Sequence, residues 1–469
     1  MSVRFSRRKA IYGALGAAVA GAAEVEATAA TARQWPILEG PDTPKLALAL
    51  GDGGGPLPAN LRPPAQDPGA ANPGGRGAGR GGGGYGGYLE QKPAAAVAPA
   101  EAANGRGGMR TGPDAYERIR QLGVNHLIGV PAGGGGGPWT VESVARAIQT
   151  AKDNGCVAYN AMLDAPESVR HGKPSRAKDL EPYIASVEAA GKAGLPVVEY
   201  NFYAHRAIEG YYETVGRARA GYTGFDYELD LLVDPETTQV LGPIYRDEAG
   251  KITEATLAAF PNARKIKFKD LPALPSEGAH NLQEMWENVT YFLKAVIPVA
   301  EKAGVRMALH PNDPPAPVSR GSQQIMGSVD GWKHFVGIVD SPANGITFDC
   351  GVTREMGSDA IATADWFASR KKINHVHFRN VQVVKPYEKY QEVFIDAGMN
   401  DMFGVMKALV KNKYTGSIYP EHPKALDADR DRLAPGSRLP GYPGGGGYTG
   451  ITFSVAYARA MMQAALESV

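Results

Sequence analysis

Short runs of apolar and β-branched residues alternate with longer amphipathic stretches from residue 45 to the C-terminus. The runs are five to seven residues long, which is typical of buried strands, and the stretches carry apolar residues at helical spacing. We therefore predict eight strands, at residues 45–50, 124–130, 156–162, 196–202, 305–310, 346–350, 373–378 and 417–422. The clearest predicted helices lie at residues 141–153, 179–192, 282–302, 399–411 and 449–469.

Glycines mark the junctions between several helices and the strands that follow. Gly123, Gly155, Gly194 and Gly304 each lie one or two residues before a predicted strand, where a left-handed helix cap is expected. Alternating strands and helices with such tight turns predict a parallel sheet, and eight repeats predict a closed (β/α)8 barrel, the TIM barrel. A doubly wound open sheet is the alternative, but no G-x-G-x-x-G motif follows the first strand.

The predicted strand-to-helix loops are much longer than the helix-to-strand turns. In such barrels the strand-to-helix loops build the active site at the carboxyl ends of the strands. The chain therefore carries its insertions where chemistry is expected, in loops at residues 51–112, 203–280, 311–327, 379–398 and 423–447.

The first 32 residues have the pattern of an export signal. Arg7 and Arg8 precede a weakly apolar stretch at 10–23, and small residues at 27–32 provide cleavage sites. The paired arginines resemble a twin-arginine (Tat) signal, which predicts export to the periplasm, with a membrane-anchoring helix as the alternative. Residues 33–469 are then a single catalytic domain that does not contact the membrane after the signal is removed.

A Gly/Pro-rich segment at residues 51–108 interrupts this domain. It holds 18 glycines and 8 prolines in 58 residues, so it lacks an apolar face and is predicted to be a disordered loop. Its arginines resemble those of Arg-Gly boxes, but the whole chain has 50 Lys+Arg against 49 Asp+Glu. A net charge of +1 argues against nucleic acid as a partner, and two cysteines exclude a disulfide framework.

Four residues with metal-binding side chains close four consecutive predicted strands. They are His310, Cys350, His377 and Glu421, and in a barrel they would point into one mouth. Each taken alone is more simply a packed core residue, so the prediction of a metal site rests on their equivalent positions. His375, two residues before His377, is predicted to be a buried core histidine.

Several segments resemble those of the mannonate dehydratase family, metal-dependent sugar-acid lyases with a xylose-isomerase-like barrel. The clearest are MALHPNDPP at 307–315, HFRN at 377–380 and YPEHP at 419–423, and the resemblance extends from about residue 112 to the C-terminus. It implies the same four metal ligands and Mn²⁺ or Fe²⁺ as the cofactor. It also implies dehydration of D-mannonate to 2-dehydro-3-deoxy-D-gluconate.

The resemblance further implies roles for residues near these ligands. His422 and Tyr442 match an acid/base pair that removes the C2 proton and protonates the leaving C3 hydroxyl, with the assignment open in either direction. The alternatives are that His422 only orients Glu421 and that Tyr442 is a lid contact. Four further residues are candidates for binding substrate: Arg379, Asn380, Arg217 and Arg219. For the last two, a solvated loop face is an equal alternative.

The chain departs from the family near the substrate. Glu421, His422 and Pro423 stand where the family usually has Asp-His-Gly, and Pro423 is expected to hold His422 in an extended conformation. A histidine expected near residues 391–396 is missing, and the loop after Phe202 is more polar. These departures are expected to affect the choice of substrate more than the binding of the metal. They predict a preferred sugar acid other than mannonate, or slow turnover of mannonate.

Two other functions stay open from the sequence. A metal-dependent sugar isomerase or epimerase of the same superfamily commonly has a glutamate on the last strand, as this chain does. A non-catalytic periplasmic sugar-acid binder could retain the metal ligands without turnover. The oligomeric state is open as well, with a homo-oligomer as one option.

Overall fold

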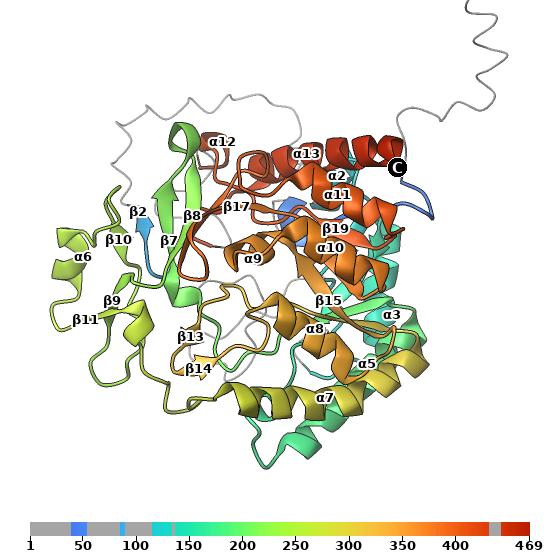
Figure 1. Ribbon diagram of the computed structural model, residues 1–469, viewed down its shortest axis with the longest axis horizontal. Coiled ribbons are helices and arrows are strands. Elements are labelled where there is room, and N and C mark those ends of the chain that lie inside the picture. The colour runs from blue at the N-terminus through green and yellow to red at the C-terminus, as the bar shows by residue number, and fades with distance from the viewer. Residues whose placement is uncertain (1–38, 54–84, 90–114, 134–136, 431–441) are drawn as a thin grey trace, which may run out of the picture. The chain divides into compact units, whose positions relative to one another are not determined.

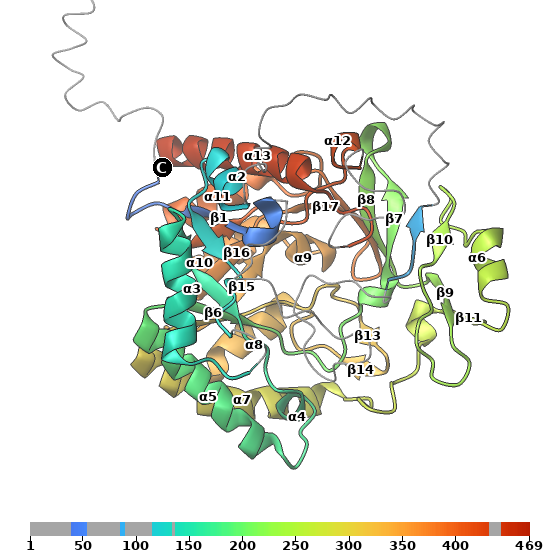
Figure 2. The same cartoon turned by 180° about the vertical axis from the view of Figure 1, so that it is seen from behind.

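The computed structural model describes residues 39–53, 85–89, 115–133, 137–430 and 442–469, so the predicted export signal lies outside the described residues. Within the unit Pro41–Val469, a parallel sheet has the strand order β4-β3-β1-β19-β16-β15-β12-β6-β5 (Figures 1 and 2). Its strands are β1 (Lys45–Ala49), β3 (His126–Ile128), β4 (Val157–Ala158), β5 (Asn160–Met162), β6 (Val197–Tyr200), β12 (Arg306–Leu309), β15 (Asn344–Asp349), β16 (Ile373–His377) and β19 (Ser417–Tyr419).

The two terminal strands of that order are halves of one strand. Only Tyr159 separates β4 from β5, and β4 pairs with β3 while β5 pairs with β6. The amide of Tyr159 donates to the carbonyl of Leu127 over 2.8 Å, which keeps the interruption within the sheet. The sheet therefore closes on itself with eight strands, and the predicted (β/α)8 barrel is confirmed.

A helix follows each barrel strand, and the glycine caps lie where the sequence predicts them. Gly194 and Gly304 have φ of 89° and 72° and end α5 and α7 in the left-handed conformation. Two starts differ from the prediction by three residues: α5 begins earlier, at Arg176, and α11 begins later, at Met402, where the side chain of Asp401 accepts from the amide of Gly404. The eight helices are α2 (Ala115–Gln121), α3 (Val141–Asp153), α5 (Arg176–Ala193), α7 (Leu282–Ala303), α8 (Val329–Ile338), α10 (Ala360–Ser369), α11 (Met402–Lys411) and α13 (Tyr448–Ser468).

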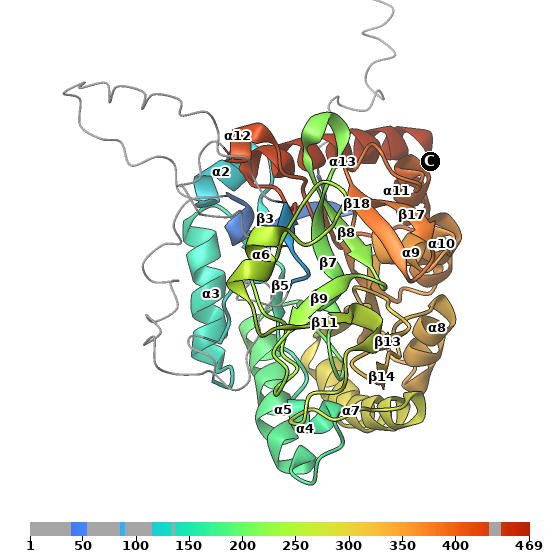
Figure 3. The same ribbon diagram turned by 90° about the vertical axis from the view of Figure 1, so that its left-hand side faces the viewer.

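The long strand-to-helix loops build a second layer of structure, which faces the viewer in Figure 3. Loops after β6 and β16 join in one antiparallel sheet with the order β17-β18-β8-β7. This layer has its own core, in which Phe225 stacks on Tyr390 with ring centroids 5.2 Å apart. Its strands are β7 (Tyr211–Val215), β8 (Gly221–Asp226), β9 (Asp230–Val233), β10 (Tyr245–Arg246), β11 (Arg264–Lys267), β13 (Val318–Ser319), β14 (Ser322–Gln323), β17 (Asn380–Lys385) and β18 (Lys389–Val393). Short helices are α4 (Glu167–Arg170), α6 (Glu254–Ala259), α9 (Cys350–Glu355), α12 (Asp427–Arg430), η2 (Leu50–Gly53), η4 (Ile208–Gly210), η5 (Arg217–Arg219) and η6 (Phe268–Asp270).

Part of the Gly/Pro-rich segment belongs to this layer. Residues 85–89 lie within it, and β2 (Tyr88–Leu89) pairs in parallel with β10. The amide of Gly86 donates to the carbonyl of Tyr211 over 2.7 Å, and Nε of Arg246 donates to the carbonyl of Gly86 over 2.6 Å. The predicted disordered loop is therefore wrong for residues 51–53, which belong to η2, and for residues 85–89, whereas residues 54–84 and 90–108 lie outside the described residues. Among the helices of the described residues, none is both long and apolar enough to cross a bilayer.

The close packing around Gly86 gives a test of whether residues 85–89 are anchored in the second layer. A Cβ at Gly86 would lie 2.2 Å from Cδ2 of Leu229 and 2.7 Å from the carbonyl oxygen of Glu209. We expect Gly86→Ala to lower the free energy of unfolding by about 1–3 kcal/mol, because a backbone oxygen cannot move aside as a flexible side chain can. Gly51→Ala is the matched control, since a Cβ there meets nothing within 4 Å. Equal melting temperatures for the two variants would show that residues 85–89 are not packed tightly in the second layer.

Candidate active site

Three of the predicted metal ligands converge at the carboxyl ends of neighbouring barrel strands. His310 directly follows β12, His377 ends β16, and Glu421 lies two residues after β19. Nε2 of His310 lies 3.2 Å from Nδ1 of His377, and Oε1 of Glu421 lies 3.0 Å from the same nitrogen. All three side chains are buried. The barrel geometry therefore brings together the residues that their positions in the sequence predict.

Two carboxylates that the sequence analysis did not single out complete this cluster. Oδ2 of Asp349 lies 3.8 Å from Nδ1 of His377, and Oε1 of Glu199 lies 3.6 Å from its Nε2. Asp349 ends β15, and Glu199 is the charged residue in the otherwise apolar run VVEY of β6. A charge inside a fully buried strand was the signal that could have identified Glu199.

The cluster fits a divalent metal. Nδ1 of His377 carries at most one proton, yet atoms of His310, Glu421 and Asp349 all lie within 4 Å of it. Two groups of His, Asp and Glu side chains include His377 and have the spacing of metal donors. The ring of His375 is fully buried, as predicted, and its Nε2 has no hydrogen-bond partner. These converging and unsatisfied atoms are what a bound cation satisfies.

The charges of the buried cluster also favour a bound divalent metal. Six carboxylates are at most 7% exposed, whereas the cations buried with them are Arg379 and Lys424. Burial raises the pKa of Glu199, Asp349 and Glu355, so these groups tend to hold protons when positive charge is lacking. A divalent cation would supply that charge and favour their ionised form. The six are Glu199, Asp313, Asp349, Glu355, Glu392 and Glu421.

The two histidines of the cluster differ in protonation because they face different charges. Burial would lower the pKa of His377, but Glu421 and Glu199 outweigh burial and raise that pKa to about 9. Burial and the positive charge of His377 lower the pKa of His310 to about 3. His310 is thus the neutral imidazole, which is the form that binds metals, whereas His377 would release its proton on binding one.

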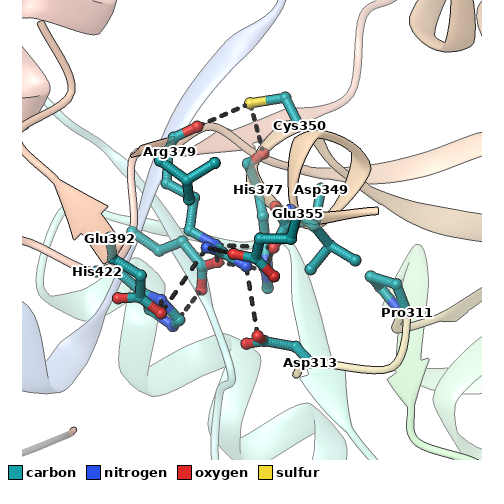
Figure 4. Close-up of polar contacts among 12 residues, drawn as sticks. Pro311, Asp313, Asp349, Cys350, Glu355, His377, Arg379, Glu392 and His422 are labelled. Carbon is teal, nitrogen blue, oxygen red and sulfur yellow. Dashed lines mark hydrogen bonds and ion pairs between the residues drawn. The ribbon is translucent and has the colours of Figure 1, made fainter. Parts of the chain in front are cut away.

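The fourth predicted ligand, Cys350, lies on another side of the cluster. It is the first residue of α9 and not the last of a strand, and its Sγ lies 3.5 Å and 3.2 Å from the carbonyl oxygens of His377 and Arg379 (Figure 4). Burial raises the pKa of its thiol. The structure does not bring Cys350 together with the His and carboxylate donors, so its role as a ligand stays a prediction.

Arg379 occupies the centre of the acidic cluster (Figure 4). Its side chain is 2% exposed and its donors face carboxylates from five positions in the chain, so it holds the site together and has little surface for substrate. Asn380 is also structural, because its amide donates to the carbonyls of Ile395 and Asn400. The atoms around Arg379 are Oδ2 of Asp349 at 3.0 Å, Oε1 of Glu421 at 3.1 Å, Oε1 of Glu355 at 2.6 Å, Oδ1 of Asp313 at 3.5 Å and Oε1 of Glu392 at 3.8 Å.

Arg217 and Arg219 are not brought to this cluster. They lie in η5, between β7 and β8, with side chains 47% and 73% exposed. Arg217 pairs with Asp396 over 2.9 Å and Arg219 pairs with Glu248. Of the two alternatives for these arginines, the solvated loop face is the one that the structure supports.

The predicted acid/base pair does come together, beside the metal-type donors. The ring centroids of His422 and Tyr442 are 4.8 Å apart. Nδ1 of His422 lies 3.0 Å from Oε1 of Glu392, and its Nε2 lies 3.4 Å from Oε2 of Glu421. Burial would lower the pKa of His422, but Glu392 and Glu421 raise it.

Two features of this pair were not anticipated. His422 has a positive φ of 49°, so the expected extended conformation before Pro423 is wrong. The hydroxyl of Tyr442 accepts a hydrogen bond from Nη2 of Arg206, a residue of the loop after β6 that the sequence analysis did not single out. Loop residues far apart in the chain carry no local signal of such a contact.

Comparisons with known proteins agree with this geometry. The family model for D-mannonate dehydratase (UxuA) matches residues 110–467. Mannonate dehydratase of Streptococcus equi subsp. zooepidemicus is 29% identical over 324 residues, which cover 68% of this chain and 82% of that protein. The crystal structure of mannonate dehydratase from Streptococcus suis serotype 2 superimposes with a TM-score of 0.56 at 25% identity, covering 76% of this chain and 93% of that one. The chain therefore belongs to the D-mannonate dehydratase (UxuA) family.

Proposed function

We propose that this protein dehydrates D-mannonate to 2-dehydro-3-deoxy-D-gluconate with the help of one divalent metal ion. The observation that carries the proposal is the junction of two groups of side chains at the barrel mouth. A metal-type donor set that ends in Glu421 lies 3.4 Å from His422, and the His422 ring contacts Tyr442. Family membership supports D-mannonate as the substrate, and the contact between the two groups of side chains supports the proposed reaction.

His310, His377 and Glu421 would hold the metal, with either Asp349 or Cys350 as a further ligand. Imidazole and carboxylate donors suit Mn²⁺ or Fe²⁺, the metals implied by the resemblance. When bound, a divalent cation supplies positive charge that stabilises the enediolate developing on the substrate's carboxylate.

The geometry favours His422 as the acid and Tyr442 as the base. Both nitrogens of His422 face carboxylate oxygens, which matches an imidazole that carries two protons. Burial raises the pKa of Tyr442, and the guanidinium of Arg206, which donates to its hydroxyl, opposes this effect by favouring the phenolate. Tyr442 then takes the C2 proton, and the C2–H electron pair moves into the carboxylate to give the enediolate. As the enediolate returns to a carboxylate, this pair forms the C2–C3 double bond and the C3 oxygen leaves as water with the proton from His422. The enol that remains becomes the 2-keto product.

Turnover by purified protein tests this function. We expect D-mannonate to be consumed in the presence of Mn²⁺ and a 2-keto-3-deoxy acid to form in equal amount. The panel includes D-gluconate and ketoses, because isomerisation of a ketose without any turnover of D-mannonate would favour the isomerase alternative.

Metal content tests the donor set independently of turnover. We expect His310→Ala to lose bound metal, measured by elemental analysis of protein purified without added metal, because it removes the neutral imidazole. His334→Ala, on α8, is the control and should retain the metal content of the parent. A full metal complement in His310→Ala would contradict the assignment. Comparing Asp349→Asn with Cys350→Ala identifies the further ligand. The variant that lacks this ligand should have a lower metal content, and the other variant should have the metal content of the parent.

We also propose that residues 1–32 direct export by the twin-arginine route to the periplasm. The support is the Arg7-Arg8 pair ahead of a weakly apolar stretch. Replacing both arginines by lysine should retain the protein in the cytoplasm, as measured by cell fractionation. Continued export of that variant would point to the general secretory route instead.

A further inference from the structure

Arg206 lies at the barrel mouth with part of its guanidinium unused. Its side chain is 24% exposed, its Nε donates to the carbonyl of Asp313 over 3.0 Å, and its Nη2 donates to the hydroxyl of Tyr442. Nη2 also lies 3.7 Å from Oδ2 of Asp313. Within the described residues, Nη1 makes no hydrogen bond, so this arginine keeps donors for a ligand next to the proposed base.

Asp313 only partly neutralises this arginine. Its Oδ1 accepts a hydrogen bond from the hydroxyl of Tyr211 over 2.5 Å and lies 3.5 Å from Nη2 of Arg379. One carboxylate thus serves two guanidinium groups. The positive charge of Arg206 is therefore available to an incoming anion.

The other cations of the site are already occupied. Arg379 and Lys424 are each 2% exposed and are enclosed by buried carboxylates such as Glu392. Nη2 of Arg379 makes no hydrogen bond among the described residues, but it is buried 3.5 Å from Asp313 and does not face the mouth as an exposed donor. Arg217 and Arg219 pair with acidic residues on the exposed loop. Of these five cations, Arg206 is therefore the one that combines partial exposure with an unused donor beside the proposed base.

A charged clamp fixes the loop that carries Arg206. The preceding residue, His205, lies between two carboxylates: Nε2 is 2.8 Å from Oε1 of Glu209, and Nδ1 is 2.7 Å from Oε2 of Glu277. Nε of Arg320 lies 2.9 Å from the same oxygen of Glu209. His205 and Glu277 lie near the two ends of the long segment between β6 and α7, and Arg320 lies in the loop after β12, so the clamp joins the ends of the first segment and ties it to the second.

We propose that Arg206 binds the carboxylate group of the substrate and that the His205 clamp holds it in place for this role. The inference rests on the proposed function and adds the residue that recognises the acid. A guanidinium binds a carboxylate through paired donors, which fixes the position of the carboxylate as well as its charge. Since Arg206 also contacts Tyr442, a carboxylate bound there places the neighbouring C2 atom beside the proposed base.

Equilibrium binding of a charged and a neutral polyol tests the proposal. The probes are D-gluconate and D-mannitol, titrated calorimetrically into Mn²⁺-loaded full-length protein. We expect Arg206→Met to weaken D-gluconate binding by about 10- to 100-fold and to leave D-mannitol binding unchanged, with Arg206→Lys intermediate. The surface variant Arg370→Met is the control and should match the parent.

Each outcome separates this inference from the proposed function. An unchanged preference for D-gluconate in Arg206→Met would overturn the inference, and so would loss of that preference in Arg217→Met. Arg206-dependent binding of D-gluconate by a protein that does not turn over D-mannonate would overturn the proposed function and leave the inference standing.

The pH dependence of stability tests the clamp. Burial would lower the pKa of His205, but Glu209 and Glu277 raise it from 6.5 to about 9. A raised pKa adds stability that is fully present below pH 6.5 and is lost as the pH rises through about 9. The other charged groups that face the clamp are Arg320, on Glu209, and His171, near Glu277.

We therefore expect the melting temperature of the parent to exceed that of His205→Gln clearly at pH 7, and the difference to shrink by pH 10. His205→Gln should also raise KM for D-mannonate more than it lowers kcat, because it displaces Arg206 without removing it. A difference in melting temperature that stays constant with pH, together with an unchanged KM, would show that His205 does not position Arg206.

Discussion

The guanidinium of Arg379 is the contact on which the site depends, because it holds carboxylates from separate parts of the barrel against one another. Asp349 and Glu355 lie at the end of β15 and in α9, Glu421 follows β19, and Arg379 itself follows β16. A single cation cannot neutralise all of them, so the arrangement is stable only with further positive charge nearby. That charge comes from Lys424 and from one of two sources at His377: a proton on its imidazole or, by our proposal, a metal ion that replaces this proton.

This constraint explains why the active site cannot be separated from the stability of the barrel mouth. Glu421 contacts His377, Arg379 and His422 at once, so it takes part in the metal-type cluster, the ion-pair network and the proposed acid/base pair. The second layer of strands contributes Glu392 from β18, which orients His422. The long loops thus do more than cover the mouth, since they supply partners without which the barrel residues would be buried as unpaired charges.

The sequence predicted the strands and helices of the barrel well, and it predicted which residues lie at the strand ends. It predicted poorly which side chains those residues contact. Hydrophobic runs and glycine caps are local signals, so they located all eight strands and placed His310 and His377 correctly. Arg379 was expected to bind substrate, because a charged residue beside a ligand motif does not reveal which carboxylates the fold packs around it. Glu199 and Arg206 were missed for a related reason: their partners come from distant loops and strands, and no spacing within the chain records those contacts.

The departures from the family at Glu421 and Pro423 act at one point, the backbone of His422. A residue before proline is normally extended, yet His422 has φ of 49°, a conformation that costs about 1–3 kcal/mol and persists only where its surroundings fix it. The residues before and after His422 are both fixed by contacts. Glu421 is held by His377 and Arg379, and the carbonyl of Pro423 accepts from the amide of Gly446 over 2.6 Å.

The result of this strain is an imidazole that lies between Glu392 and Glu421 and not on an extended strand. A longer carboxylate reaches farther from the backbone than the aspartate that the family usually carries, and a left-handed turn at the next residue changes the direction in which the imidazole leaves the chain. The two departures therefore meet in one contact: with the turn at His422, its imidazole lies 3.4 Å from the Glu421 carboxylate. The same contact joins the proposed acid to the cluster of metal-type donors, so a change at either departure is expected to act on both.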